Sequence, residues 1–175
     1  MGYGMGAYRK KGKKKKKKKV KVSKRKETVP ILVTEVFKDN VLDPLISLLH
    51  TEFTRVPIHH DVEFKPRESF FLRMIPITDN IVEQTTEDQI RNYGIMIRFY
   101  RKTPGRVDRE DNFRQLMNYT DRLKRLIGNN SNYSPSNTYK WHDGRISSIS
   151  FQPDIDEDEA QYQCADALFE CTVLV

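Results

Sequence analysis

The strongest constraint on the fold is an amphipathic segment, Asp108–Ile127, that precedes strand-forming residues running to the end of the chain. Its apolar residues recur at near-helical spacing, and most of its charged residues fall on other faces. Asp108 is the predicted N-cap, and Gly128 is expected to end the helix in a left-handed conformation. Such a helix needs a sheet to cover its apolar stripe. The predicted stripe comprises Phe113, Leu116, Met117, Leu123 and Ile127, interrupted by Thr120 and Lys124.

A second amphipathic helix is predicted earlier in the chain. Asp43 followed by Pro44 is typical of a helix start, with aspartate as N-cap and proline at the first helical position. The residues before it, Val29–Phe37, are mostly apolar and β-branched, which favours a short strand or a lead-in segment. We expect this helix to bury Leu42, Leu45, Ile46, Leu49 and Phe53.

Two apolar strands are predicted between the helices, over Ser69–Ile77 and Asn92–Arg101. Both are rich in Phe, Ile, Met and Tyr with partial alternation. The intervening Thr78–Arg91 is polar and acidic, and it is long for a hairpin turn. We expect it to be a loop that is either mobile or an interaction surface.

The C-terminal part of the chain predicts two further strands. Asp143-Gly144, before Arg145–Phe151, is typical of a β-hairpin turn, and Pro153–Glu159 is predicted to be an acidic turn. The last strand is predicted over Tyr162–Val175, with one apolar face covered by a helix. That face comprises Ala165, Ala167, Phe169, Cys171 and Val173.

The order of elements is therefore helix, strand, strand, helix, strand, strand. This order indicates an α+β fold with two amphipathic helices packed on one mainly antiparallel sheet of about four to five strands. A chain of 175 residues is long enough to form such a core without disulfides. We expect a single domain over 29–175, preceded by a disordered basic arm over 1–28.

The charge of the chain is sharply divided. Its net charge is +7, but Arg9–Lys26 holds 14 basic residues and no acidic residue, which leaves 17 basic against 24 acidic residues elsewhere, a net −7. An arm of this kind is either a solubilising tail, a nuclear-import signal, or a contact for nucleic-acid phosphates or an acidic protein surface. The predicted contact residues are Arg9, Lys10, Lys11, Lys13, Lys14, Lys15, Lys16, Lys17, Lys18, Lys19, Lys21, Lys24, Arg25 and Lys26.

Motifs for catalysis, cofactors or metals are not found in the sequence. The glycine patterns of phosphate-binding and dinucleotide-binding loops are missing, and the acidic run at Asp154–Glu159 lacks the glycine and glutamate of a calcium-binding loop. His59-His60 has no third ligand at metal-site spacing. Cys164 and Cys171 are seven residues apart on one predicted strand, so they point to opposite faces and cannot form a disulfide there. We expect no enzymatic activity, no cofactor and no membrane partner.

The arrangement of elements resembles the tail terminator (tail completion) proteins of tailed bacteriophages. The resemblance spans Val33–Val175 and rests on the order and size of the elements. The similar pieces are Leu45–Leu49, Phe71–Pro76, Leu116–Ile127, Trp141 with Ile146–Phe151, and Cys171–Val175.

This resemblance implies a structural virion protein that forms a ring, commonly hexameric, at the head-proximal end of the tail tube. The ring would join the tube to neck proteins, after a period in the host cytoplasm during assembly, and it would act by steric capping. The basic arm departs from the family pattern. It supports an alternative, a nucleic-acid-binding accessory or packaging protein; a capsid shell protein is a third interpretation, although a jelly roll needs eight strands.

Overall fold

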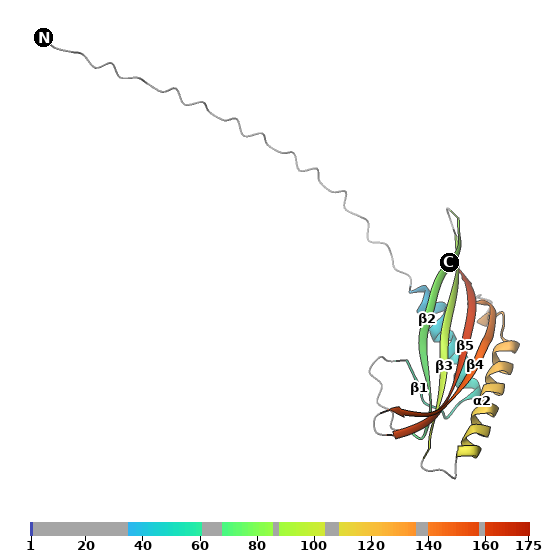
Figure 1. The fold of residues 1–175 in the computed structure, drawn as a ribbon. Helices are drawn as coiled ribbons and strands as arrows, with labels where there is room; N and C mark the ends of the chain where they lie inside the picture. The colour runs from blue at the N-terminus through green and yellow to red at the C-terminus, as the bar shows by residue number, and fades with distance from the viewer. Residues whose placement is uncertain (2–34, 61–67, 86–87, 104–108, 136–139, 158–159) are drawn as a thin grey trace. The chain divides into compact units, whose positions relative to one another are not determined.

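Two helices and five strands form the described part of the computed structural model (Figure 1). All of them belong to one compact unit, Thr34–Val175. The predicted boundary between arm and domain at 28/29 lies outside the described residues and stays a prediction. The structure describes residues 1, 35–60, 68–85, 88–103, 109–135, 140–157 and 160–175, without the side chains of 153–157 and 160.

The sheet has the strand order β1-β2-β3-β5-β4 within the described residues. Only β1 and β2 pair in parallel; the β2–β3, β3–β5 and β5–β4 pairs are antiparallel. The predicted α+β class and mainly antiparallel sheet are therefore confirmed. The strands are β1 (Ile58–His59), β2 (Phe70–Gln84), β3 (Gln89–Lys102), β4 (His142–Glu157) and β5 (Ala160–Leu174).

Both helices cover the same face of the sheet, because their apolar side chains join alternate residues of β2, β3 and β5 in one buried cluster. The predicted apolar face of the last strand is confirmed, with all five of its residues buried. Phe53 at the end of α1 packs edge-on against Phe99 of β3, with ring centroids 5.6 Å apart. The opposite face of the sheet has no helix in the described part of the chain, and we call it the helix-free face.

The first helix begins earlier than Asp43, so the predicted N-cap is wrong. Val36 and Phe37 are already helical, which also corrects the predicted strand at the end of Val29–Phe37; positions 29–34 lie outside the described residues. A π-helical turn, η1 (Lys38–Leu42), leads into α1 (Asp43–Glu52), and the Asp43 N–H donates to the Lys38 carbonyl. Because Pro44 has no N–H and crowds the preceding turn of a regular helix, the wider turn accommodates it.

The second helix, α2 (Arg109–Asn129), confirms the predicted segment and three residues of its stripe, because Leu116, Leu123 and Ile127 are fully buried. Thr120 is buried and donates its hydroxyl to the Met117 carbonyl at 2.8 Å, whereas Phe113 and Met117 are exposed. Gly128 is helical, and no described glycine has a positive φ, so the predicted left-handed stop is wrong. Asn130 instead bonds the helix end, with its side-chain amide donating to the Leu126 carbonyl at 2.8 Å. The predicted N-cap, Asp108, lies outside the described residues.

The predicted turn at Asp143-Gly144 is wrong, and the predicted acidic turn is strand over most of its length. Asp143 and Gly144 lie inside β4, at a register shift between His142 and Arg145, and Asp143 has a φ of 52°. The pair therefore forms a β-bulge, and the Gly144 N–H donates to the Ser131 carbonyl at 2.7 Å. The predicted acidic turn Pro153–Glu159 is strand as far as Glu157, and positions 158–159 lie outside the described residues.

Candidate assembly surfaces

The outer half of β2, Pro76–Gln84, forms a free edge of the sheet as far as the described residues extend. β1 pairs only with Leu72 and Arg73, so β3 is the sole described strand beside this half. All nine of its side chains are exposed. A free edge presents unpaired backbone N–H and C=O groups and can add a further strand or another protein surface.

This result corrects the predicted loop at Thr78–Arg91. β2 and β3 continue through most of it, from Thr78 paired with Gly94 to Gln84 paired with Gln89. The hairpin end is held at both sides: the Thr85 N–H donates to the Asp88 carbonyl at 2.9 Å, and Gln89 exchanges two backbone bonds with Val175. The outer half of β2 is therefore paired with β3 along its length, and β3 is in turn bonded to the end of the chain beyond β5.

Three apolar side chains are concentrated on this edge, and we call them the β2 patch. Ile77, Ile81 and Val82 are 48%, 52% and 60% exposed. Single exposed apolar residues are common, but three within six positions of a free edge indicate an interaction surface. Charges of both signs lie beside these residues: Asp79 and Glu83 are on the same strand, and Arg91, which pairs with Ile81 across the strands, lies 3.5 Å from Asp79.

A second exposed apolar surface lies on α2, and we call Phe113 and Met117 the α2 patch. These side chains are 41% and 46% exposed and lie one helical turn apart. Phe113 contacts Phe151 of β4, with ring centroids 5.1 Å apart. At 100° per residue, Lys124 falls on the same stripe as Met117, and Arg114 lies beside it. Glu110 and Asp121 lie on the same flank and pair with these cations, at 2.7 Å to Arg114 and 3.8 Å to Lys124, so the α2 patch has neighbours of both charges.

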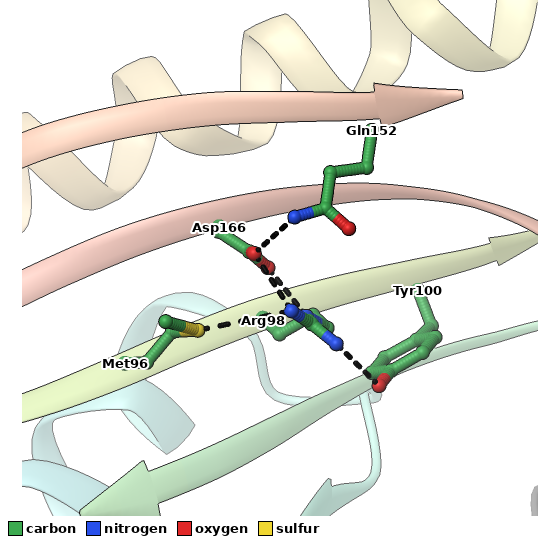
Figure 2. A network of polar contacts seen from close by, with 5 residues as sticks. All are labelled: Met96, Arg98, Tyr100, Gln152 and Asp166. Atoms are coloured by element: carbon green, nitrogen blue, oxygen red, sulfur yellow. Dashed lines mark hydrogen bonds and ion pairs between the residues drawn. The ribbon is translucent and has the colours of Figure 1, made fainter. Parts of the chain in front are cut away.

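The helix-free face carries a polar network centred on Arg98 of β3 (Figure 2). The guanidinium binds both carboxylate oxygens of Asp166 on β5, and its Nη2–Oδ2 distance is 2.8 Å. Gln152 donates to the same carboxylate at 3.1 Å, and Nη1 of Arg98 donates to the Tyr100 hydroxyl at 3.4 Å. Figure 2 shows the guanidinium lying between Asp166 and Tyr100. The network thus joins β3, β5 and β4.

The charges of this network are satisfied within the protein. The side chains of Arg98 and Asp166 are only 18% and 7% exposed, and the hydrogen bonds that Arg98 donates to Asp166 raise the pKa of Arg98. A buried bidentate pair of this kind contributes more to specifying a register than to stability. We therefore regard it as a structural tie between strands and not as a binding site for an ion.

Two pockets lie on the described part of the protein. The pocket at Asn80, Asn92 and Thr172 has a volume of about 220 Å³, and the hollow at Gln115, Tyr119 and Arg122 has a volume of about 360 Å³. Small-molecule sites typically have volumes of roughly 300–1,000 Å³. No group of three or more His, Cys, Asp or Glu side chains in the described part of the chain could hold a metal ion. Neither described helix has the length and apolar character needed to cross a membrane.

The two cysteines lie on opposite faces of β5, as the sequence predicted. Cys164 belongs to a small buried aromatic cluster with Phe71, Tyr100 and Tyr162, and Cys171 belongs to the main core; neither cysteine forms a disulfide. Burial raises the pKa of the Cys171 thiol to about 12. A thiol with such a pKa is almost entirely protonated near neutral pH and is a poor nucleophile.

All 14 predicted contact residues of the basic arm, Arg9–Lys26, lie outside the described residues. Sequence reasoning placed Ile77 at the end of a strand and predicted the segment with Ile81 and Val82 to be a mobile loop or an interaction surface, but it missed the strand there because the segment is mostly polar. A usable signal was the β-branched content of that segment, which favours strand.

Comparisons with known proteins identify no relative of this chain. No family model matches it, and a search of curated proteins finds no match.

Proposed function

We propose that this protein is a structural subunit that assembles into a ring of the kind that terminates a bacteriophage tail. Its partners would be copies of itself, the tail tube protein and a neck protein, and its final location the virion. The ring would act by occupying the growing end of the tube, without enzymatic chemistry.

The observation that carries this proposal is the pair of exposed apolar surfaces on separate elements. The β2 patch lies on a free strand edge and the α2 patch on a helix flank, and their five residues are each more than 40% exposed. A subunit with two different contact surfaces can join head to tail, and such contacts close into rings when the rotation between copies allows it.

The test is the assembly state of the full-length protein in low and in high salt, combined with electron microscopy of the same samples. We expect annular particles with a central opening. A protein that remains a single chain at every concentration and salt tested, and that shows no annular particles, would contradict the proposal.

The charge of the arm supports a second candidate, a nucleic-acid-binding accessory or packaging protein. Fourteen basic residues within 9–26 would bind phosphates without sequence preference, and affinity would fall steeply with salt. Fluorescence anisotropy with duplex DNA tests this candidate. Full-length protein with Lys13–Lys19 replaced by glutamine should lose most of the affinity and most of the salt dependence. Unchanged binding by this variant would reject a role for the arm.

A further inference from the structure

Asp143-Gly144, at the bulge in β4, is the one Asp-Gly pair in the sequence, and the sequence has no Asn-Gly pair. An Asp-Gly pair is prone to rearrangement, because glycine has no side chain to hinder attack by its backbone nitrogen on the aspartate Cγ. The new N–Cγ bond closes a succinimide ring, and the N–H proton leaves with the carboxyl hydroxyl as water. Water then reopens the ring at either carbonyl and gives aspartate or isoaspartate, so the reaction needs no other reactant.

In the folded protein the attacking nitrogen is engaged. The Gly144 N–H donates to the Ser131 carbonyl at 2.7 Å, and Gly144 is buried. The preceding N–H, that of Asp143, donates to the side-chain oxygen of Asn132 at 3.2 Å. The nitrogen can attack only after the bond to Ser131 is broken, and breaking a buried hydrogen bond is costly. Ring closure therefore requires the bulge to open first.

The geometry of the bulge explains why so reactive a pair occurs here. A Cβ on Gly144 would lie 2.6 Å from Nε1 of Trp141 and 3.2 Å from the Ser131 carbonyl oxygen, so a larger residue does not fit. Asp143 has a φ of 52°, in the left-handed region that aspartate and asparagine adopt more readily than most residues. Both members of the pair are therefore favoured by the folded backbone.

Isoaspartate at this position would break the joint between α2 and β4. Trp141 donates its indole N–H to the Asn130 carbonyl at 3.1 Å and stacks on Tyr133, with ring centroids 4.7 Å apart. The bond from Gly144 to Ser131 lies next to these contacts, because Ser131 directly follows Asn130. In isoaspartate the main chain runs through Cβ and is one atom longer. The Gly144 N–H is then displaced from its acceptor, and the bulge cannot close in its original form.

We propose that Asp143-Gly144 is a conditional modification site, inert while the bulge is closed and converted to isoaspartate when the start of β4 opens. The rate in the folded protein is then the intrinsic rate multiplied by the fraction of chains whose bulge is open. Each conversion is retained, because the longer main chain does not fit the bulge. Isoaspartate therefore accumulates with the time that a chain has spent open.

The first test compares folded and unfolded chains. The full-length protein is incubated at neutral pH, either in buffer or in urea, and isoaspartate at position 143 is measured by peptide mapping with mass spectrometry. We expect the unfolded chain to react at least about tenfold faster, because the folded chain reacts only through its open fraction. A folded rate within about twofold of the unfolded rate would overturn the proposal.

The second test loosens the bulge from one side. Asn132→Ala removes the acceptor of the Asp143 N–H, so isoaspartate should form about two- to tenfold faster in the folded protein, as expected when one hydrogen bond is lost. Asn118→Ala is the matched control, because it truncates an exposed asparagine on α2. Circular dichroism verifies that both variants are folded, and in urea all three chains should react alike. Equal rates for the three folded proteins would overturn the proposal that the bulge controls the reaction.

Discussion

The two halves of β2 pair with the same neighbour, β3, but only the inner half is buried. Phe71, Leu72 and Met74 are at most 1% exposed, whereas every side chain from Pro76 to Gln84 is exposed. The inner half packs on the helix layer or within the small aromatic cluster, and the outer half extends past both. The comparison separates two uses of apolar residues in one strand: the inner ones stabilise the fold, and the outer ones are available for assembly.

The largest loss of stability is expected when the ion pair between Arg98 and Asp166 is broken. This pair lies beside the inner half of β2, where Arg73 pairs with Arg98 across the strands. Asp166→Ala leaves Arg98 buried without its carboxylate and should lower the unfolding free energy by about 3–5 kcal/mol. Urea unfolding at equal, low protein concentration measures this loss. The double variant Arg98→Met with Asp166→Leu should recover most of it. If Asp166→Ala lowers the unfolding free energy by less than about 1 kcal/mol, the network does not hold the strands together as we describe.

A direct comparison of the two halves uses the same kind of truncation in each. Leu72→Ala should cost about 2–5 kcal/mol, because it removes a fully buried side chain. Ile81→Ala should change the unfolding free energy by less than about 0.5 kcal/mol, because its side chain is already in water. Equal losses from the two variants would show that the outer half contributes to the core.

The border between the halves can be tested at Gly94, which pairs with Thr78. A Cβ at this position would lie 2.5 Å from Oγ1 of Thr78, so Gly94→Ala should destabilise the protein by about 1–3 kcal/mol. Adding Thr78→Ala removes the clashing oxygen and should restore most of the loss, since the Thr78 Cβ is 3.7 Å away. Additive losses in the double variant would contradict this contact. Thermal unfolding of the three variants provides the measurement.

The smallest effect is the pH dependence of stability that comes from Cys171, a buried residue of β5 on the face that the helices cover. Asp79 of β2 pairs with Tyr93 of β3, which pairs with Cys171 of β5. Asp79 is exposed, whereas Tyr93 and Cys171 are buried. Because burial raises the pKa of Cys171 to about 12, above its ordinary 9.0, the unfolded chain loses this proton first as pH rises. The resulting stability is present below pH 9 and is lost progressively from there to about pH 12.

The expected slope is at most about 1.4 kcal/mol per pH unit for one thiol. Unfolding free energies between pH 8 and pH 10 should therefore fall more steeply for the wild type than for Cys171→Ala. Identical slopes would mean that the thiol is not shielded from water in the folded protein.

The order of elements and the buried face of β5 could be predicted from the sequence because both depend on local periodicity. Alternation placed Ala165 through Val173 on one face, and helical spacing located α2. The prediction failed where tertiary contacts decide. Asp143-Gly144 forms a bulge and not a turn because Ser131, which lies outside the strand, supplies a backbone acceptor beside it.

The assembly surfaces could be predicted only in part. The segment containing Ile81 and Val82 was recognised as a possible interaction surface, but its strand structure was missed because its side chains face water and show no alternation. Phe113 and Met117 were assigned to the core because their spacing fits the stripe. Which flank of a helix stays exposed depends on the width of the sheet beneath it, and that width is set by strands distant in the sequence.

The most direct test of the account is the solution mass of the full-length wild type and of Ile81→Asp, measured by light scattering over a range of concentrations. The account predicts a wild-type particle with the mass of about six 20.6 kDa chains and a single-chain variant that remains folded. A wild type and a variant that both remain single chains, or that assemble equally well, would contradict it.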